Sequence, residues 1–352
     1  MTAVPRMPAS LDQVDADWLT AALSIRYPHT VVTSAVHGSE VRATGTKLRL
    51  LLDYNDAGHA HRLPPTMWFK SGLEPHSDHV RTSHERESFF YDNIQPLGLL
   101  NAPDCYFAGT DDRGFSGQLI EDLLARNARF GSALKPVSPA VAARTLSMLA
   151  RLHAHWWMAP ELEQLGPPGG SLATDGIVLR LITPEAWEAA MVAPAASALP
   201  RALHDVTTVR AGMEALWAYD TASDARCMVH GDAHPGNLFF DQDDRPGFLD
   251  YQRVMQCDWA HDVNYCLVST MSVADAEAHE RDLLDHYLRE LAAHGGPPLE
   301  REAAWYSYRR HTMYGLIWNA VPTGMQTAEI VEAVATRFNA AAARLDLPTI
   351  MR

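Results

Sequence analysis

The sequence predicts an α+β protein in which a small sheet-rich part precedes a larger, mostly helical part. Before residue 122, apolar and polar residues alternate over short stretches, which is the pattern of strands with one buried face. After residue 123, apolar residues recur with the 3.6-residue period of amphipathic helices. A chain of 352 residues is long enough for about two domains. We therefore expect one domain over residues 1–122 and a second over residues 123–352.

In the N-terminal part, the strand-like stretches are short and separated by turn residues. Residues 31–54 have a strand-like pattern, and Gly45 stands just before the clearest alternation. The stretch 55–65 is rich in Asn, Asp, Gly and Pro and predicts a loop. Ser10, with Gln13 three residues later, predicts a capped helix start. Further strands are expected over 66–70 and 117–120, and helices over 10–23 and 83–94.

The C-terminal part is dominated by helical periodicity. Ser138 followed by Pro139 is typical of a helix start, since proline is tolerated at the first helical position. The Pro- and Gly-rich stretch 160–176 predicts a loop or an insertion. Helices are expected from residue 138 onward and over 209–219, 273–293, 301–320 and 327–345.

The composition argues against several classes of partner. The formal net charge of −14 disfavours nucleic acid, which attracts clustered Lys and Arg, and anionic membranes. The start of the chain lacks the basic and then apolar order of a secretory signal, and no apolar run approaches the length of a membrane span. The four cysteines form no C-x-x-C pair, so we expect reduced thiols. A cytoplasmic monomer or homodimer without nucleic-acid or membrane partners is expected.

One segment concentrates residues suited to phosphoryl transfer. Residues 230–237 read His-Gly-Asp-Ala-His-Pro-Gly-Asn, and Asp250 follows a stretch that predicts a hairpin. Transfer of a phosphoryl group from ATP needs a carboxylate that orients the attacking hydroxyl, and oxygen ligands that hold Mg²⁺ against the phosphates. The kinase catalytic loop has the form H-x-D-x-x-x-x-N, with a second Asp further on. Asp232 and Asn237 have this spacing.

At these residues the sequence resembles the aminoglycoside phosphotransferase and choline kinase superfamily, whose signature is H-G-D-x-H-x-x-N followed by a hydrophobic strand and an Asp. The ending Asp250-Tyr251-Gln252, with Asp17-Trp18-Leu19 near the start of the chain, resembles its ecdysteroid-kinase-like branch. The resemblance implies a two-lobed protein-kinase-like fold, with a small antiparallel-sheet lobe that binds ATP and a helical lobe that binds substrate. It also implies Mg²⁺-dependent transfer of the γ-phosphate to a hydroxyl of a small molecule.

The resemblance also assigns roles to the residues of the motif. Asp232 would be the catalytic base, and Asn237 and Asp250 would be the magnesium ligands. His230 would fix the loop, and His234 would brace the loop or lie close to the phosphates. Asp262 matches a structural Asp of the family, and by its position it is expected to cap the next helix.

The N-terminal part offers the residues that would bind the nucleotide. A kinase needs a Lys that bridges the α- and β-phosphates, held by a helix Glu. Lys70 ends a predicted strand and Glu87 lies in the following helix, with Glu85 as a rival for the pairing. By resemblance, backbone groups of Glu121 and Leu123 would bind the adenine edge. The glycine-rich phosphate loop would lie over residues 37–46, although they lack G-x-G-x-x-G.

Other readings remain open at this point. A protein kinase would need D-F-G and A-P-E motifs, which do not follow Asp250. If residues 230–234 formed a strand, His230, Asp232 and His234 would face one side of it and could bind the metal ion of a hydrolase. An inactive nucleotide-binding pseudokinase is a further alternative. The acceptor could be an aminoglycoside-, choline- or steroid-like alcohol. Aromatic residues that could form its pocket are Trp156, Trp157, Trp187, Trp217, Trp259, Tyr306, Tyr308, Tyr314 and Trp318.

Overall fold

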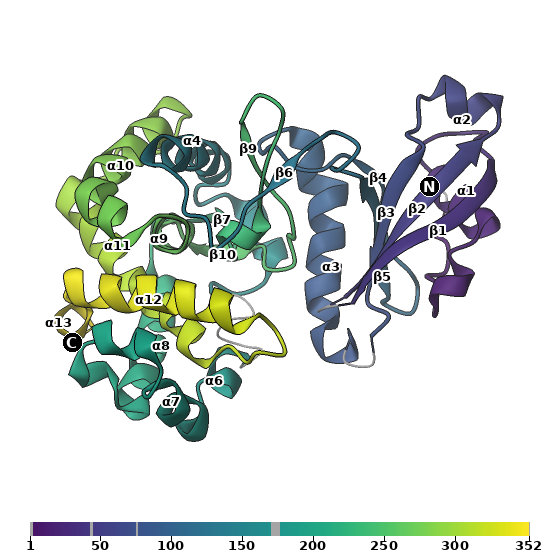
Figure 1. Ribbon diagram of the computed structural model, residues 1–352. Coiled ribbons are helices and arrows are strands. Elements are labelled where there is room, and N and C mark those ends of the chain that lie inside the picture. Colours follow the sequence, from purple (N-terminus) through teal and green to yellow (C-terminus); the bar gives the residue numbers. More distant parts are fainter. Residues whose placement is uncertain (1–2, 43–44, 75–76, 170–176, 352) are drawn as a thin grey trace. The chain divides into compact units, whose positions relative to one another are not determined.

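The computed structural model describes residues 3–42, 45–74, 77–169 and 177–351. The chain forms two compact units, each of which is described by itself (Figure 1). The N-terminal unit holds residues 1–129, 241–243 and 248–253, and the C-terminal unit holds residues 130–240, 244–247 and 254–352. The assignment of nucleotide binding to residues 1–122 and of catalysis to residues 123–352 stays a prediction.

A five-stranded antiparallel sheet forms the frame of the N-terminal unit, with strand order β1-β2-β3-β5-β4. The strands are β1 (Val32–Arg42), β2 (Thr46–Tyr54), β3 (Thr66–Ser71), β4 (Cys105–Thr110) and β5 (Ser116–Glu121). Each strand pairs with the next strand along the chain, except that β3 and β4 are separated by β5, which pairs with both. The strands expected over 31–54, 66–70 and 117–120 are confirmed.

The alternation of β2 and β3 gives the sheet two different faces. Leu48 and Leu50 of β2 are buried in the hydrophobic core with Phe69 of β3, because side chains two residues apart lie on the same face of a strand. Lys47 and Lys70 therefore lie on the opposite face. One face of the sheet supplies the core of the unit, and the other carries the charged side chains.

One helix lies on each side of this sheet, α1 on one and α3 on the other (Figure 1). Helix α1 (Ala16–Leu23) contacts β1 and β4 and buries Leu19 and Leu23 in the core. Helix α3 (Arg81–Phe89) contacts β4 and β5 and continues as a π-helix over Phe90–Ile94. The helix expected over 83–94 thus starts slightly earlier and changes its winding near its end.

Two local expectations in this unit are wrong. The helix expected over 10–23 begins only at Ala16, and its cap is Asp15, whose carboxylate accepts a hydrogen bond from the Trp18 amide at 2.8 Å. Ser10 precedes a short 3-10 helix, Leu11–Gln13, and its side chain caps nothing. The loop expected over 55–65 contains helix α2 (Asp56–Ala60), because Asn55 caps that helix instead of only making a turn.

The C-terminal unit is mostly helical. Its helices are α4 (Pro139–His155), α6 (Ile177–Leu181), α7 (Pro184–Ala190), α8 (Val206–Ala222), α9 (Ala260–Thr270), α10 (Val273–Ala293), α11 (Arg301–Gly315), α12 (Ala328–Arg344) and α13 (Leu347–Ile350). The strands after the N-terminal sheet are β6 (Arg129–Phe130), β7 (Arg226–Val229), β8 (Leu238–Phe240), β9 (Pro246–Phe248) and β10 (Met255–Asp258).

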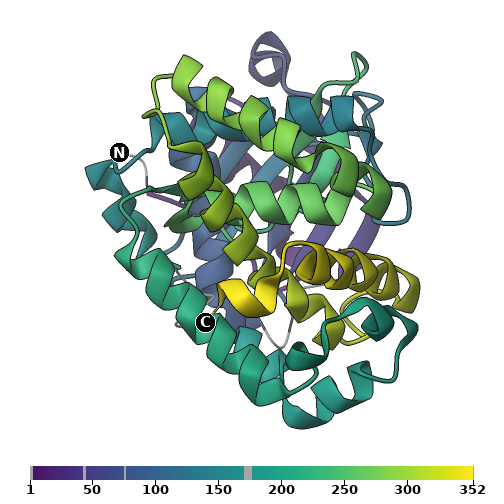
Figure 2. The ribbon, with the colours of Figure 1, turned by 90° about the vertical axis from the view of Figure 1, so that its left-hand side faces the viewer.

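Helix α9 forms the centre of this unit, since every one of its residues is buried. It contacts α4, α10, α11 and α12, which Figure 2 views from the helical side. Strand β10, which precedes α9, pairs antiparallel with β7, and β7 leads directly into residue 230. The loop that carries the predicted catalytic residues is thus held by a strand pair and by the central helix.

The fold class expected from the sequence, an α+β protein-kinase-like fold, is confirmed. Ser138 caps α4 as expected, and its hydroxyl accepts a hydrogen bond from the Val141 amide. Within the stretch 160–176, Pro160–Leu165 forms a 3-10 helix, and residues 170–176 lie outside the described part of the chain. Among the described residues, no helix combines the length and apolar character needed to cross a membrane.

Candidate active site

The N-terminal unit brings together Lys70, Glu87 and Asp250, which are far apart in the sequence. Lys70 Nζ lies 2.7 Å from the Glu87 carboxylate and 3.0 Å from Asp250 Oδ1. The Lys70 and Glu87 side chains are 3% and 1% exposed, whereas Asp250 is 26% exposed. Glu87, and not Glu85, is therefore the partner of Lys70. Asp250 is therefore the member of this cluster that is most exposed to solvent.

Lys70 stays charged in this environment. Burial by itself would lower the pKa of the Lys70 ammonium, but attraction to Asp250 and Glu87 outweighs burial and raises its pKa above the usual value. A buried lysine held this way is a fixed positive charge. Its position on β3 and its Glu partner on α3 match the arrangement that a kinase uses to hold phosphates.

A second lysine, Lys47, joins this cluster, and the sequence analysis missed it. Lys47 on β2 is the direct cross-strand partner of Lys70 on β3, and its Nζ lies 3.6 Å from Asp250 Oδ2. The signal that could have found it is compositional, because the chain has three lysines in all, Lys47, Lys70 and Lys135. Two of the three lie side by side on the charged face of the sheet.

Asp250 is held in an uncommon backbone conformation. Its φ of 66° lies in the left-handed region, which costs free energy for a residue other than glycine. The next residue anchors it: the Tyr251 ring stacks on Phe90 with a centroid distance of 3.4 Å, and its hydroxyl donates to the Phe248 carbonyl at 2.9 Å. The tyrosine that follows Asp250 is thus a packing residue, which fixes the carboxylate beside the two lysines.

The segment expected to contact adenine lies at the end of β5. The Glu121 amide donates to the Asp104 carbonyl at 2.8 Å, and the Leu123 carbonyl accepts from Ala128. Asp122 between them is buried and accepts hydrogen bonds from the side chains of Arg49 and Trp68. The fold therefore already uses one backbone group of Glu121 and one of Leu123. Adenine contacts would use the Glu121 carbonyl and the Leu123 amide.

The segment expected to form the phosphate loop, residues 37–46, covers the end of β1 and the first residue of β2. Residues 37–42 belong to β1, which is irregular between His37 and Glu40, and residues 43–44 lie outside the described part of the chain. Gly45 leaves no room for a side chain, because a Cβ there would lie 2.8 Å from the His84 ring and 3.0 Å from the Ser71 carbonyl oxygen. The close approach of the backbone explains why this position is a glycine.

In the C-terminal unit, Asp262 holds the loop that carries the H-G-D sequence. Its carboxylate accepts hydrogen bonds from the amides of His230, at 2.6 Å, and Gly231, at 2.9 Å. His153 Nε2 lies 3.3 Å from the same carboxylate. The expectation that Asp262 caps its own helix is wrong: α9 begins at Ala260, and the acid reaches back to another segment.

Asp262 is ionised and fully buried. Burial by itself would raise the pKa of its carboxyl group, but the hydrogen bond from His153 and the attraction of neighbouring histidines outweigh burial and hold the pKa below the usual value. Gly231, which this carboxylate holds, has a φ of 80°, a conformation that glycine adopts without strain. The backbone turn that presents Asp232 therefore depends on one buried charge.

Asp232, His234 and Asn237 lie together in this loop. Asn237 Nδ2 donates to the Asp232 carbonyl at 2.9 Å and lies 3.3 Å from Asp232 Oδ2. His234 Nε2 is 3.7 Å from the same oxygen, and Asp232 is 30% exposed. Burial and, after it, the charge of Asp232 raise the pKa of the Tyr265 hydroxyl well above its usual value. The loop thus presents a partly exposed carboxylate whose surroundings are fixed by hydrogen bonds.

A sequence model of the phosphotransferase enzyme family matches residues 72–306, which is more than half of the chain and includes every motif residue from Glu87 to Asp262. The chain belongs to this family. Membership supports small-molecule phosphotransferase activity and confirms the resemblance to the aminoglycoside phosphotransferase and choline kinase superfamily. The finer placement in the ecdysteroid-kinase-like branch stays a prediction. A comparison with curated proteins found no match.

Solved structures of similar proteins include an aminoglycoside 3'-phosphotransferase of type VIII, with 18% identity, 82% of this chain and 95% of that chain covered, and a TM-score of 0.44. An ethanolamine kinase from Plasmodium vivax is 12% identical over 96% of this chain and 90% of that chain, with a TM-score of 0.47. A choline kinase from Streptococcus pneumoniae is 12% identical over 87% of this chain and 94% of that chain, with a TM-score of 0.43.

The geometry of the family motif does not favour the metal-dependent hydrolase. His230 Nδ1 accepts a hydrogen bond from the Asp232 amide, and His234 Nδ1 accepts one from the Gly236 amide. These residues lie in a loop and a 3-10 turn and not on a strand. Within the described ranges, the one cluster of metal-ligating side chains contains none of these three residues. Both histidines instead stabilise the loop, as the family resemblance implied for His230.

Proposed function

We propose that this protein is an ATP- and Mg²⁺-dependent kinase that transfers the γ-phosphate to a hydroxyl of a small molecule. The observation that carries the proposal is the cluster of Lys70 and Lys47 on adjacent strands, held by Glu87 and Asp250. Two fixed cations beside a partly exposed carboxylate suit a polyphosphate and its metal ion. The Lys47 side chain is 31% exposed and can therefore reach a ligand on this face of the sheet.

The donor atoms at the proposed metal-binding positions fit Mg²⁺. Mg²⁺ prefers oxygen ligands, and Asp250 offers a partly exposed carboxylate. Asn237 donates through Nδ2 to Asp232, which leaves its amide oxygen as the ligand atom. When bound, Mg²⁺ would neutralise charge on the phosphates. Adenine would contact the backbone of Glu121 and Leu123.

Asp232 is the proposed catalytic base. Its carboxylate would accept the proton of the acceptor hydroxyl and orient that hydroxyl towards the γ-phosphorus. The hydrogen bond from Asn237 keeps the carboxylate in place, and its exposed fraction of 30% gives an alcohol access to it. His230 fixes the loop, and His234 braces it beside Asp232. Catalysis would be mainly positioning and charge neutralisation.

The acceptor class that we propose rests on buried aromatic side chains that pack around His234, which follows Asp232 in the H-G-D loop. The Trp318 indole donates to the Tyr265 hydroxyl at 2.8 Å, and the His234 ring packs edge-on against Trp318. Tyr314 packs against Tyr265 at a centroid distance of 5.1 Å. Aromatic faces favour apolar rings and organic cations. We propose an alcohol with an apolar or cationic body, such as a steroid-like alcohol, choline or an aminoglycoside.

The experiment compares the wild-type chain with Asp232→Asn and with Asp282→Asn, an exposed carboxylate on α10 that serves as the matched control. ATP binding with and without Mg²⁺ is measured by calorimetry, and ADP release is measured with a panel of sterols, choline, aminoglycosides and sugars. Asp232→Asn should bind ATP within about threefold of wild type but transfer phosphate at least about 100-fold more slowly. Asp282→Asn should behave as wild type.

Each other outcome has a definite meaning. Full activity of Asp232→Asn would refute the role of Asp232. No ATP binding at millimolar concentration with Mg²⁺ would refute the kinase. Tight ATP binding without ADP release in the presence of any alcohol of the panel would favour the nucleotide-binding pseudokinase.

A further inference from the structure

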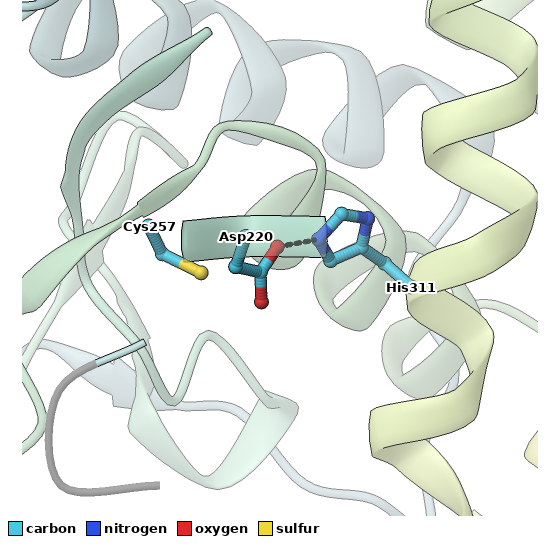
Figure 3. Close-up of side chains that lie close together, drawn as sticks. All are labelled: Asp220, Cys257 and His311. Carbon is cyan, nitrogen blue, oxygen red and sulfur yellow. Dashed lines mark hydrogen bonds and ion pairs between the residues drawn. The ribbon is translucent and has the colours of Figure 1, made fainter. Parts of the chain in front are cut away.

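A second cluster of reactive side chains lies in the C-terminal unit, away from the H-G-D loop. Asp220 on α8, Cys257 on β10 and His311 on α11 point towards one another (Figure 3). One ligand atom from each, an Asp oxygen, the Cys sulfur and a His nitrogen, lies within 4.8 Å of the other two. All three residues are buried. The tertiary fold collects these three donors from separate elements, and the proposed reaction uses none of them.

The hydrogen bonds of His311 define which ring nitrogen faces the cluster. Nδ1 lies 2.7 Å from the Ser307 carbonyl oxygen. A carbonyl oxygen only accepts hydrogen bonds, so Nδ1 carries the proton. In a neutral imidazole, Nε2 then presents a lone pair to Asp220 Oδ1, which is 3.0 Å away. Two lone pairs at this distance repel each other, so a positive charge must lie between them, either a proton or a metal ion.

The donor set of the cluster favours a metal ion over a proton. Cys257 adds a sulfur to the same cluster, and a second buried carboxylate, Asp258, adds negative charge next to it. The oxygens of Asp258 are already occupied by the Ser223 and Ser307 hydroxyls and the Ala260 amide, so it contributes charge and not a ligand. A proton on His311 beside the Cys257 thiol and a divalent ion beside the Cys257 thiolate give the cluster the same net charge, so the sulfur donor, and not the charge, favours the ion.

A pocket open to solvent is lined by chain neighbours of the cluster residues. Asp258 and Ser307, which adjoin Cys257 and His311 along the chain and by hydrogen bonds, also line an open pocket of about 300 Å³. Tyr219, the neighbour of Asp220 on α8, lines the same pocket. None of the three donor residues lines this pocket, so an ion reaches them only when side chains of the pocket lining move. Side chains of this kind rearrange more readily than the backbone.

We propose that Asp220, Cys257 and His311 form a binding site for a zinc-type divalent ion. Imidazole nitrogen, thiolate sulfur and carboxylate oxygen are the ligands that Zn²⁺ takes in proteins, with a fourth position for a further donor. The Nδ1 hydrogen bond to a backbone carbonyl is the usual orienting contact of a metal-bound histidine. On binding, the Cys257 thiol and His311 Nε2 each release one proton to solvent, and the ion takes the place of the proton between His311 and Asp220.

The site would connect three elements that support the H-G-D loop. Cys257 lies on β10, which pairs with β7 just before His230 and leads into α9, the helix of Asp262. Asp220 and His311 fix α8 and α11 to this strand. The ion would therefore stabilise the frame of the catalytic loop without contacting substrate. This inference does not depend on the proposed kinase activity.

The test uses the full-length, tag-free protein after metal removal with a chelator. Zn²⁺ is titrated while the melting temperature is followed, and Co²⁺ is used as a spectroscopic probe, because a cobalt–thiolate bond gives a charge-transfer absorption. Cys257→Ala is compared with Cys266→Ala, which removes an equally buried thiol from α9 outside the cluster. Wild type and Cys266→Ala should show the absorption and a raised melting temperature. Cys257→Ala should lose the absorption and bind Zn²⁺ at least about tenfold more weakly.

If Cys257→Ala does not fold, Cys257→Ser replaces it, since a serine of similar size keeps the packing but gives no cobalt–thiolate absorption. The proposal is overturned if folded, metal-free wild type takes up neither ion. It is equally overturned if the Cys257 variants bind Zn²⁺ as tightly as wild type, which would place the ion on surface histidines. Nitrogen NMR that finds both ring nitrogens of His311 protonated in protein exposed to Zn²⁺ would also overturn it.

Discussion

The buried carboxylate of Asp262 supports the backbone of the H-G-D loop, so its replacement by Asn should destabilise the whole protein. Asn keeps one acceptor oxygen where Asp has two, and both oxygens of Asp262 are used: Oδ2 by the His230 amide and Oδ1 by the Gly231 amide. The amide nitrogen of Asn would face a backbone N–H, so one buried donor would lose its partner. The hydrogen bond that remains would no longer be charge-assisted.

The magnitude follows from these contacts. A hydrogen bond to a charged group contributes about 1.5–3 kcal/mol, and leaving a buried donor unsatisfied costs about 1–3 kcal/mol. The replacement also removes the partner of His153, 3.3 Å away. We therefore expect Asp262→Asn to lower the free energy of unfolding by about 3–4 kcal/mol, within the range for breaking a buried ion pair. Urea unfolding monitored by circular dichroism measures it.

Asp205 provides the matched control. Its carboxylate also accepts hydrogen bonds from two backbone amides, those of Thr207 and Thr208, but it is an exposed helix cap. Asn caps helices about as well as Asp, so Asp205→Asn should change the free energy of unfolding by less than about 0.5 kcal/mol. A loss below about 1 kcal/mol for Asp262→Asn, or equal losses for the two variants, would refute the reasoning from burial.

The pKa of Asp262 lies below its unfolded value of about 3.9, so its contribution to stability is present above that pH and is lost as the pH falls through the folded pKa. Urea unfolding from pH 5 to pH 2 should show a steeper loss for wild type than for Asp262→Asn, and parallel curves would contradict this. Lys47→Met should weaken Mg-ATP binding by about tenfold in calorimetry, because it removes roughly one charge-assisted contact. It should lower the free energy of unfolding by less than about 1 kcal/mol, because the Lys47–Asp250 ion pair is partly exposed. Lys135→Met, at an exposed lysine, is the control, and equal affinities of the two variants for Mg-ATP would exclude Lys47 from the nucleotide site. Gly315→Ala would place a methyl group inside the Phe338 ring, so it should lower the free energy of unfolding in urea by about 1–3 kcal/mol. Gly324→Ala, with open space around the glycine, is the control and should leave the free energy of unfolding nearly unchanged. An unchanged free energy for Gly315→Ala would show that Phe338 can move aside.

Sequence patterns predicted the parts of the fold and site that are encoded locally. The helix periods and the strand alternation follow from contacts with one buried face, and the C-terminal helices occur close to where they were expected. Asp232 and Asn237 lie five positions apart in one loop, and the Asn237 amide bonds directly to Asp232. The helix start was less predictable: Ser10 and Asp15 are both good caps, and the packing of α1 on the sheet selected Asp15.

The sequence alone determined that the chain carries the H-G-D loop, its Asn and a Lys followed by two candidate Glu partners, because each is an identity or a spacing along the chain. Only the tertiary structure decided which residues meet from a distance. Strand register placed Lys47 opposite Lys70, helix packing aimed Asp262 at the amides of His230 and Gly231, and three separate elements brought Cys257 to Asp220 and His311. Such contacts depend on how the whole core packs, and the spacing of residues along a chain does not encode the register of its strands or the faces of its helices that meet.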